Sequence, residues 1–266
     1  MTTIAEILRN ARDETERRDF EVLTAEALGV DRAYLYAHAD EAPSAARNAR
    51  LQHMLRDYRA GTPVAYIIGR RAFWNLELDV SPAVLIPRPE TELLVELALQ
   101  RLPPHARVLD LGTGSGAIAL AIKRERVDCA VTATDISEAA LAMARGNAAK
   151  YRLEIELRAG DWYGAATGTF DAVLSNPPYV GSGDPHLDSL VSEPSLALIA
   201  GGDGLAALRI IIDGASMHLA SGGWLIIEHG CDQGASVRHQ FERAGFAAVE
   251  TVRDGAEHER VTLGMR

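Results

Sequence analysis

Residues 108–117 read VLDLGTGSGA, a short apolar run followed at once by three closely spaced glycines. The apolar run predicts a buried strand. The glycines predict a turn whose backbone can approach a ligand and which opens a helix at Ala117 with its first amides free. A strand, a glycine turn and a helix in this order fit the pattern of dinucleotide-binding domains, but the turn alone does not identify the ligand.

The chain after this turn alternates between strand and helix patterns. Strands are expected at 108–111, 130–134, 155–158, 172–175 and 224–228, and helices at 117–124, 137–150 and 204–219. This order is typical of an α/β fold with a doubly wound, mostly parallel sheet and helices on both faces. Ligands of such sheets bind beyond the carboxyl ends of the strands, so the residues just after each strand are the candidate site residues.

The chain before the turn has a different texture. Apolar residues recur at helical spacing in 4–11, 22–28 and 51–58, and an alternating pattern at 73–80 suits a hairpin. We therefore expect a small N-terminal helical domain over 1–70, a hairpin and linker over 71–90, and a larger domain over 91–266.

The composition limits the class of protein. Of the 266 residues 47% are apolar and 24% charged, as in globular proteins, and the net charge is −10. An acidic chain is not expected to track a nucleic-acid backbone, which requires clustered Lys and Arg. Cys129 and Cys231 are too few for a disulfide framework, and the eight histidines form no ligand-spaced pair, so no metal site is expected. Without a signal peptide pattern or a long apolar run, we expect a cytoplasmic protein with no membrane contact.

Two strand ends carry candidate cofactor ligands. Asp135 follows the second strand, roughly 20 residues after the glycine turn, where a carboxylate can accept hydrogen bonds from two ribose hydroxyls. The alternative is that Asp135 caps the helix that begins near Ser137. Asp161 and Trp162 follow the third strand, where an acceptor and an indole can hold the amino group and the face of an adenine, although a turn and a core tryptophan fit equally well.

The fourth strand ends in Asn176-Pro177-Pro178-Tyr179. Each proline fixes φ at about −65°, and the first also excludes Asn176 from the helical region. The Asn176 side-chain oxygen and the Pro177 carbonyl can then accept from both hydrogens of a planar NH2 group while the Tyr179 ring covers its face. The alternative is a stiff turn that only ends a strand.

This clamp separates two enzyme classes that share the glycine turn. A hydride-transfer enzyme needs no amide clamp at the fourth strand end, whereas methyl transfer to an amide nitrogen does. The nitrogen lone pair is delocalised, and hydrogen bonds to both hydrogens favour pyramidalisation as the new bond forms. The pattern therefore indicates a methyltransferase.

The chain resembles the S-adenosylmethionine-dependent methyltransferases, and over nearly its whole length it is similar to the release-factor glutamine N5-methyltransferases. The resemblance rests on GTPVAYIIG at 61–69, LIPRPETE at 85–92, VLDLGTGSG at 108–116, NPPYV at 176–180, EP at 193–194, GGDGL at 201–205 and EHG at 228–230. The clamp alone is shared with adenine-N6 and cytosine-N4 DNA methyltransferases. The proline-arginine-proline segment and the N-terminal helical module make the resemblance specific.

The resemblance implies a Rossmann-like methyltransferase sheet and S-adenosyl-L-methionine as the cofactor. The residues implied to cradle its methionine part are Gly112, Thr113, Gly114, Ser115 and Gly116. Asp135 is implied to bind its ribose, Trp162 to lie beside its adenine, and Asn176 to border it.

The resemblance also implies a substrate, the glutamine of the Gly-Gly-Gln loop of class I peptide chain release factors, which the N-terminal domain helps to grip. Asn176, Pro177, Pro178 and Tyr179 are implied to bind its amide, with Asn176, Pro177 and Tyr179 as the catalytic residues. No direct contact with nucleic acid is expected.

Two segments depart from the family pattern. Glu257 stands where a glycine is expected, and the loop over 186–193 is short and lacks an expected arginine-phenylalanine pair. Two other functions stay open. An adenine-N6 nucleic-acid methyltransferase would have to extrude its base and normally carries a basic surface, which the acidic balance disfavours. A non-catalytic S-adenosylmethionine-binding scaffold is disfavoured by the intact clamp.

Overall fold

The computed structural model describes residues 2–183 and 192–266, so the short loop noted in the sequence lies outside the described residues except for Ser192 and Glu193. The chain divides into two compact units, Met1–Arg70 and Arg71–Arg266.

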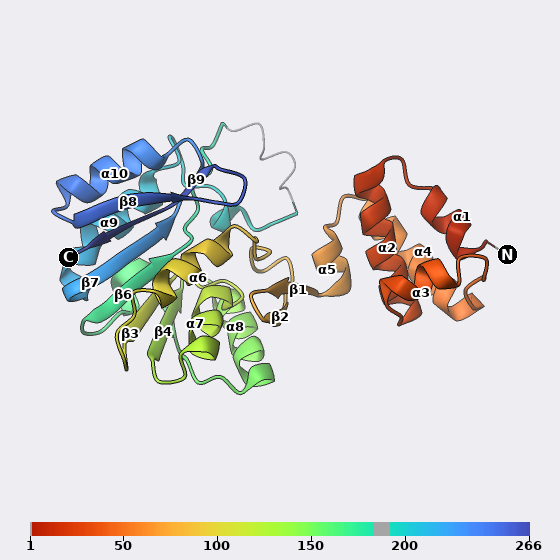
Figure 1. The fold of residues 1–266 in the computed structure, drawn as a ribbon, viewed down its shortest axis with the longest axis horizontal. Coiled ribbons are helices and arrows are strands. Elements are labelled where there is room, and N and C mark those ends of the chain that lie inside the picture. Colours follow the sequence, from red (N-terminus) through yellow and green to blue (C-terminus); the bar gives the residue numbers. More distant parts are fainter. Residues whose placement is uncertain (1, 184–191) are drawn as a thin grey trace. The chain divides into compact units, whose positions relative to one another are not determined.

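The first unit consists of helices around a core of its own (Figure 1). They are α1 Ile4–Arg9, α2 Glu14–Leu28, α3 Arg32–Ala37, α4 Ala45–Arg59 and α5 Val64–Ile68. The helices α1 to α4 begin with side-chain caps, because Thr3, Asp13, Asp31 and Ser44 each accept a hydrogen bond from a backbone amide of the first turn. The core residues include Phe20, Leu23, Leu35 and Leu51, all fully buried.

The second unit opens with a hairpin of β1 Arg70–Phe73 and β2 Leu76–Asp79 and continues as an α/β domain. Its further strands are β3 Arg107–Leu111, β4 Ala130–Asp135, β5 Glu156–Ala159, β6 Phe170–Ser175, β7 Leu219–Glu228, β8 Ala247–Arg253 and β9 Glu259–Met265. Its helices are α6 Thr91–Leu99, α7 Ala117–Glu125, α8 Glu138–Tyr151, α9 Ala206–His218 and α10 Gly234–Arg243, with the short 3₁₀ helices η1 Trp162–Ala165 and η3 Ser195–Ala197.

Within the described residues the large sheet has seven strands in the order β5-β4-β3-β6-β7-β9-β8. The first five in this order run parallel, and β9 is antiparallel to both β7 and β8. The expected doubly wound, mostly parallel α/β sheet is thereby confirmed. The largest difference at a boundary is in β7: the strand expected at 224 already begins at Leu219, which pairs with Phe170 before the register with β6 shifts.

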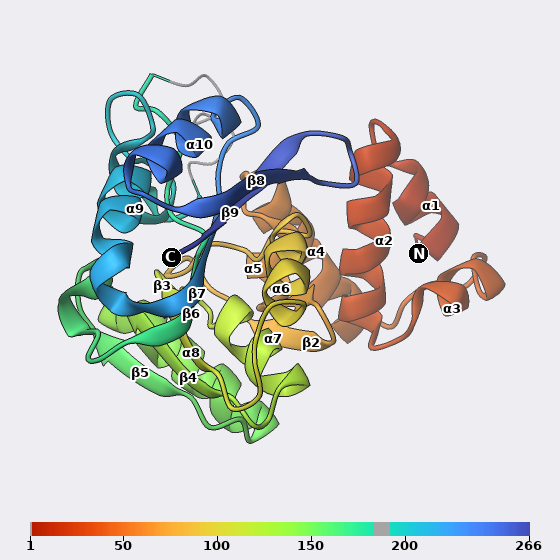
Figure 2. The same ribbon diagram turned by 60° about the vertical axis from the view of Figure 1, so that its left-hand side comes forward.

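The alternation of side chains along β3 explains the two layers of helices. Val108 faces a core shared with α6, α7 and α8, whereas Leu109 and Leu111 face a core shared with α9 and α10. Figures 1 and 2 show α9 and α10 on one side of the sheet and α6 and α7 on the other. Both faces of the central strand are therefore buried.

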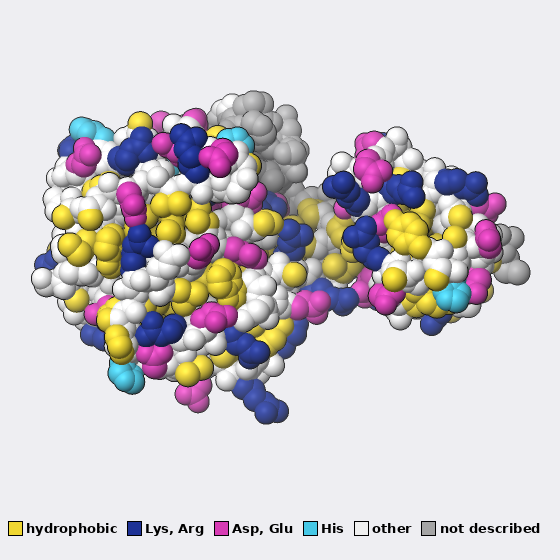
Figure 3. Space-filling model, in the orientation of Figure 1, with side chains coloured by type: hydrophobic (Ala, Val, Ile, Leu, Met, Phe, Trp, Pro, Cys, Tyr) yellow, Lys and Arg dark blue, Asp and Glu magenta, His cyan; other side chains and the backbone are white. Residues whose placement is uncertain are grey.

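On the face drawn in Figure 3, Lys and Arg side chains are interspersed with Asp and Glu. None of the helices in the described part of the chain has both the length and the apolar character that crossing a bilayer requires.

Candidate active site

A cavity of about 430 Å³ lies in the second unit beyond the carboxyl ends of β3, β4, β5 and β6. The predicted site residues that line it are Gly112, Gly114, Asp135, Trp162, Asn176, Pro177 and Pro178. The sheet thus brings together residues from four separate strand ends, as expected for an α/β domain. Thr113, Ser115, Gly116 and Tyr179 do not line the cavity, and each has a different place.

The glycine turn between β3 and α7 is shaped by contacts below the cavity. Gly116 has φ of 86°, and a Cβ atom there would lie 3.0 Å from the Leu120 side chain, so any other residue would be strained and crowded. Thr113 donates to Asp110 at 2.6 Å, and the Ser115 carbonyl accepts from Asn147 at 2.9 Å. These residues fix the turn whose upper side, Gly112 and Gly114, faces the cavity.

Asp110 is completely buried under this turn. Burial raises the pKa of its carboxyl to about 7, although the hydrogen bond from Thr113 acts in the opposite direction. Its Oδ2 atom accepts that bond, and its buried Oδ1 atom has no hydrogen-bond partner among the described residues. Asp110 does not line the cavity, so its carboxyl holds the turn through Thr113 from beneath.

Asp135 bonds to two backbone amides and also lines the cavity. Its Oδ2 atom accepts from the Gly114 amide and its Oδ1 atom from the Ser137 amide, each at 2.9 Å. Ser137, not Asp135, is the N-cap of α8. Each carboxylate oxygen has a further lone pair, and Asp135 lines the cavity, so the carboxylate can still accept from a diol.

Trp162 opens η1 and lines the cavity together with Asp161. Its backbone has φ of 44°, which is unusual for a residue other than glycine, and its carbonyl accepts from the Thr134 hydroxyl at 3.2 Å. A Cβ atom on Gly112 would lie 3.6 Å from the indole ring. The ring therefore stands against the glycine turn as one wall of the cavity.

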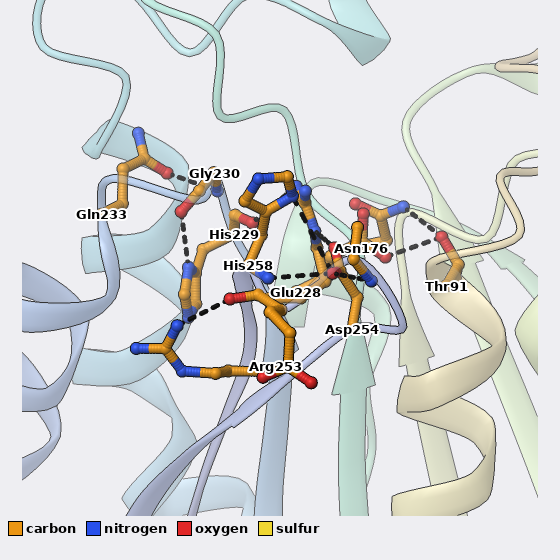
Figure 4. A network of polar contacts seen from close by, with 12 residues as sticks. Thr91, Asn176, Glu228, His229, Gly230, Gln233, Arg253, Asp254 and His258 are labelled. Carbon is orange, nitrogen blue, oxygen red and sulfur yellow. Dashed lines mark hydrogen bonds and ion pairs between the residues drawn. The ribbon is translucent and has the colours of Figure 1, made fainter.

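The carboxamide of Asn176 is held in a defined orientation (Figure 4). Its Nδ2 atom donates to the Thr91 hydroxyl at 3.0 Å, and that hydroxyl donates to Glu228 Oε2 at 2.6 Å. Among the described residues, nothing donates to Asn176 Oδ1. The acceptor of the predicted clamp is therefore available to a ligand.

Tyr179 completes the same network from below. Its hydroxyl donates to Glu228 Oε1 at 3.3 Å, and burial together with this carboxylate raises the pKa of Tyr179. The Tyr179 carbonyl accepts from Gln233 at 3.0 Å, and a Cβ atom on Gly204 would lie only 2.5 Å from that carbonyl. Gly204, the last glycine of the GGDGL segment, thus permits this segment to pack against the Tyr179 carbonyl.

Sequence reasoning assigned no role to Thr91 or Glu228. Glu228 ends β7 directly after an apolar run, and burial raises its pKa to about 7 against the opposing effects of Thr91 and Arg260. A charged residue directly after Leu225, Ile226 and Ile227 was the signal that could have identified it.

Four exposed apolar side chains at the cavity were also missed. Ile136, Leu196, Ile199 and Ile210 all line it. The segment that carries two of them is tied to the clamp, because Val180 donates to the Leu198 carbonyl and accepts from the Ala200 amide, each at 3.0 Å. These side chains give the cavity an apolar rim.

Neither His229 nor His258 lines the cavity. His229 is completely buried between the Gly230 carbonyl and the Thr262 hydroxyl, and burial lowers its pKa. His258 is largely exposed beside Asp254. Within 2–183 and 192–266, no group of His, Cys, Asp and Glu side chains could hold a metal ion.

Comparisons with known proteins place this site in a family. Residues 89–256 match the Methyltransferase small domain and residues 1–69 match the PrmC N-terminal domain. The chain is 52% identical over 265 residues to the release factor glutamine methyltransferase of Xylella fastidiosa strain Temecula1, covering 97% of this chain and 96% of that protein. The chain belongs to the release factor glutamine methyltransferases. The resemblance seen in the sequence is confirmed.

A second release factor glutamine methyltransferase, from Escherichia coli strain K12, is 44% identical over 94% of this chain and 92% of its own length. Among solved structures, a methyltransferase from Pyrococcus furiosus is similar in fold, with a TM-score of 0.56 and 20% identity over 80% of this chain and 96% of that one. The expected methyltransferase fold is thus found in the family match of the second unit and in its sheet.

Proposed function

We propose that this chain transfers a methyl group from S-adenosyl-L-methionine to the side-chain amide nitrogen of the glutamine in the Gly-Gly-Gln motif of class I peptide chain release factors. The observation that carries the proposal is the Asn176 carboxamide, fixed by Thr91 with its oxygen available at the edge of the cavity. Membership in the release factor glutamine methyltransferases supports the same substrate.

The cavity residues fit the cofactor. When bound, S-adenosylmethionine supplies the methyl group as an electrophile. We assign its ribose to Asp135, its adenine to the Trp162 wall, and its methionine part to Gly112 and Gly114. Thr113, Ser115 and Gly116 contribute by fixing the shape of the turn.

The clamp residues act on the substrate amide. Asn176 Oδ1 and the Pro177 carbonyl accept from its two hydrogens, which lowers the cost of withdrawing the nitrogen lone pair from the amide π-system. Pro178 stiffens the turn, and Tyr179 anchors it through Glu228. We further propose a cytoplasmic location, because the exposed Cys231 is a free thiol and suits a reducing compartment.

The test is transfer of a radiolabelled methyl group to a purified release factor, with DNA and RNA as alternative acceptors. We expect label on the release factor alone, and peptide mass spectrometry should place it on the Gly-Gly-Gln glutamine. Label on adenine only would instead support the nucleic-acid alternative. Cofactor binding without transfer to any acceptor would support the scaffold alternative.

A further inference from the structure

Two buried residues of the second unit stand behind the clamp without touching the cavity. The exposed fraction of Thr91 is 4% and that of Glu228 is 1%, and neither lines the cavity. Thr91 is the first residue of α6, and Glu228 is the last residue of β7, so two elements far apart in the chain meet at this point. Burying an ionisable group costs free energy, and the contacts that Glu228 makes indicate the function of this buried carboxyl.

The direction of the hydrogen bonds follows from counting protons. The Thr91 hydroxyl has one proton and lies 2.6 Å from Glu228 Oε2 and 3.0 Å from Asn176 Nδ2. An ionised carboxylate only accepts, so the hydroxyl proton points to Glu228. The hydroxyl oxygen is then left as an acceptor, and only the NH2 end of the Asn176 carboxamide can bond to it.

We propose that Thr91 and Glu228 are positioning residues for methyl transfer, which hold the Asn176 carboxamide with its oxygen, not its nitrogen, toward the substrate amide. This inference rests on the proposed function. If the carboxamide were turned over, its NH2 group would face the NH2 group of the substrate, and one of the two acceptors of the clamp would be lost. The two orientations have nearly the same shape, so packing alone does not choose between them.

The protonation state of Glu228 controls the orientation of the Asn176 carboxamide. The groups that face Glu228 are Thr91 and Glu90 at the start of α6, Tyr179 after β6 and Arg260 on β9. A protonated Glu228 can donate to Thr91, which turns the hydroxyl proton toward Asn176 and favours the reversed carboxamide. Because burial raises the pKa of Glu228 to about 7, this change falls in an accessible pH range.

The first experiment compares two substitutions that each remove one buried hydroxyl. Thr91→Val removes the acceptor of Asn176, whereas Thr262→Val removes a hydroxyl of β9 that bonds to His229 and Thr251. We expect Thr91→Val to lower kcat about tenfold or more at unchanged affinity for S-adenosylhomocysteine, and Thr262→Val to change kcat by no more than about twofold. Thr91→Ser, which restores the hydroxyl, should recover most of the loss. Equal effects of the two valine variants would overturn the proposal.

The second experiment uses Glu228→Gln, which keeps the shape of the side chain and removes its charge. In the unaltered enzyme kcat should fall as the pH is lowered through about 7. In Glu228→Gln this decrease should be absent or much shallower, since no proton can be added. A decrease of the same midpoint and depth in both proteins would assign it to another group and contradict the positioning role.

A third measurement does not depend on activity. In a ¹H–¹⁵N spectrum the side-chain NH2 signal of Asn176, identified by its absence in Asn176→Ala, should be slow to exchange with solvent and should lose this protection in Thr91→Val. Unchanged protection would overturn the proposal even if the enzyme methylated release factors normally. Conversely, if the unaltered enzyme methylated no release factor, the proposed function would fail while this orientation remained measurable.

Discussion

At the scale of single residues, the proposed role of Asp135 is to bind the cofactor while it also holds the glycine turn. Its two bonds to backbone amides leave lone pairs that face the cavity. We predict that Asp135→Ala weakens binding of S-adenosylhomocysteine by about 1.5 to 3 kcal/mol while unfolding remains cooperative. Calorimetric titration measures this, with Asp213→Ala on the exposed side of α9 as the control. An unchanged affinity would remove Asp135 from the cofactor site.

Substitutions of Asn176 should affect the chemical step and not the binding of the release factor. Asn176→Ala removes the acceptor, and Asn176→Asp removes the NH2 group that bonds to Thr91 and adds a charge. Both variants should fold, because Pro177 and Pro178 stiffen the turn, and both should lose about 100-fold or more in kcat with little change in release-factor affinity. Single-turnover methylation followed by mass spectrometry measures the chemical step. Near-normal methylation by Asn176→Ala would falsify the clamp.

Asp110 should make stability depend on pH. Its folded pKa of about 7 lies above its model-peptide value of 3.8, so between these values the folded state holds more protons and stability falls as the pH rises. Asp110→Asn removes this pH-dependent part of the free energy of unfolding, which amounts to at most about 4 kcal/mol. Urea unfolding at pH 5 and pH 8 measures this. From pH 5 to pH 8 the free energy of unfolding of the unaltered protein should fall relative to that of Asp110→Asn. A constant difference would contradict the buried, titrating carboxyl.

At the scale of elements, the central strands could be predicted because their signal is local. Runs such as that over 172–175 are apolar on both faces, and β6 extends this prediction by only two residues, to Phe170. The sequence reasoning did not identify β8, β9 or α10. Along β8 the exposure changes irregularly and none of its residues is buried, as at the edge of a sheet, so no alternation was available to read.

The residues of the candidate site likewise fall into those that could be predicted from the sequence and those that could not. Residues that directly follow strands could be predicted as cavity residues, because parallel strands deliver their carboxyl ends to one edge. Thr91 and Glu228 are 137 residues apart, and only the packing of α6 on β7 makes them neighbours. No spacing rule within one element contains that information.

The turn between β8 and β9 explains why a glycine is expected at position 257. Glu257 has φ of 64°, a conformation that costs a residue with a Cβ atom about 1 to 2 kcal/mol. Glycine avoids this cost but loses about 0.5 to 1 kcal/mol through its freer unfolded chain. We predict that Glu257→Gly raises the free energy of unfolding by about 0.5 to 1 kcal/mol. Denaturant unfolding measures it, and Glu257→Ala, which keeps the Cβ atom, should show no gain.

At the scale of the whole molecule, both cores of the second unit and the entire cavity lining belong to residues 71–266. We predict that a chain of residues 71–266 folds and binds S-adenosylhomocysteine about as tightly as the full protein. Because a separate family covers residues 1–69, we expect the loss of this unit to raise KM for the release factor. Steady-state kinetics with both chains test this, and equal kcat/KM values would show that the first unit does not grip the substrate.

The position of β9 has a consequence for synthesis on the ribosome. This strand follows all the others in the chain, yet it lies inside the sheet between β7 and β8. Residues 1–70 can collapse around their own core as soon as they emerge. The sheet of the second unit, by contrast, has a gap until residues 259–265 are released, and with it Arg260 is missing beside Glu228. The surroundings of Glu228, and with them the support of the Asn176 clamp, are therefore complete only after β9 has left the ribosome.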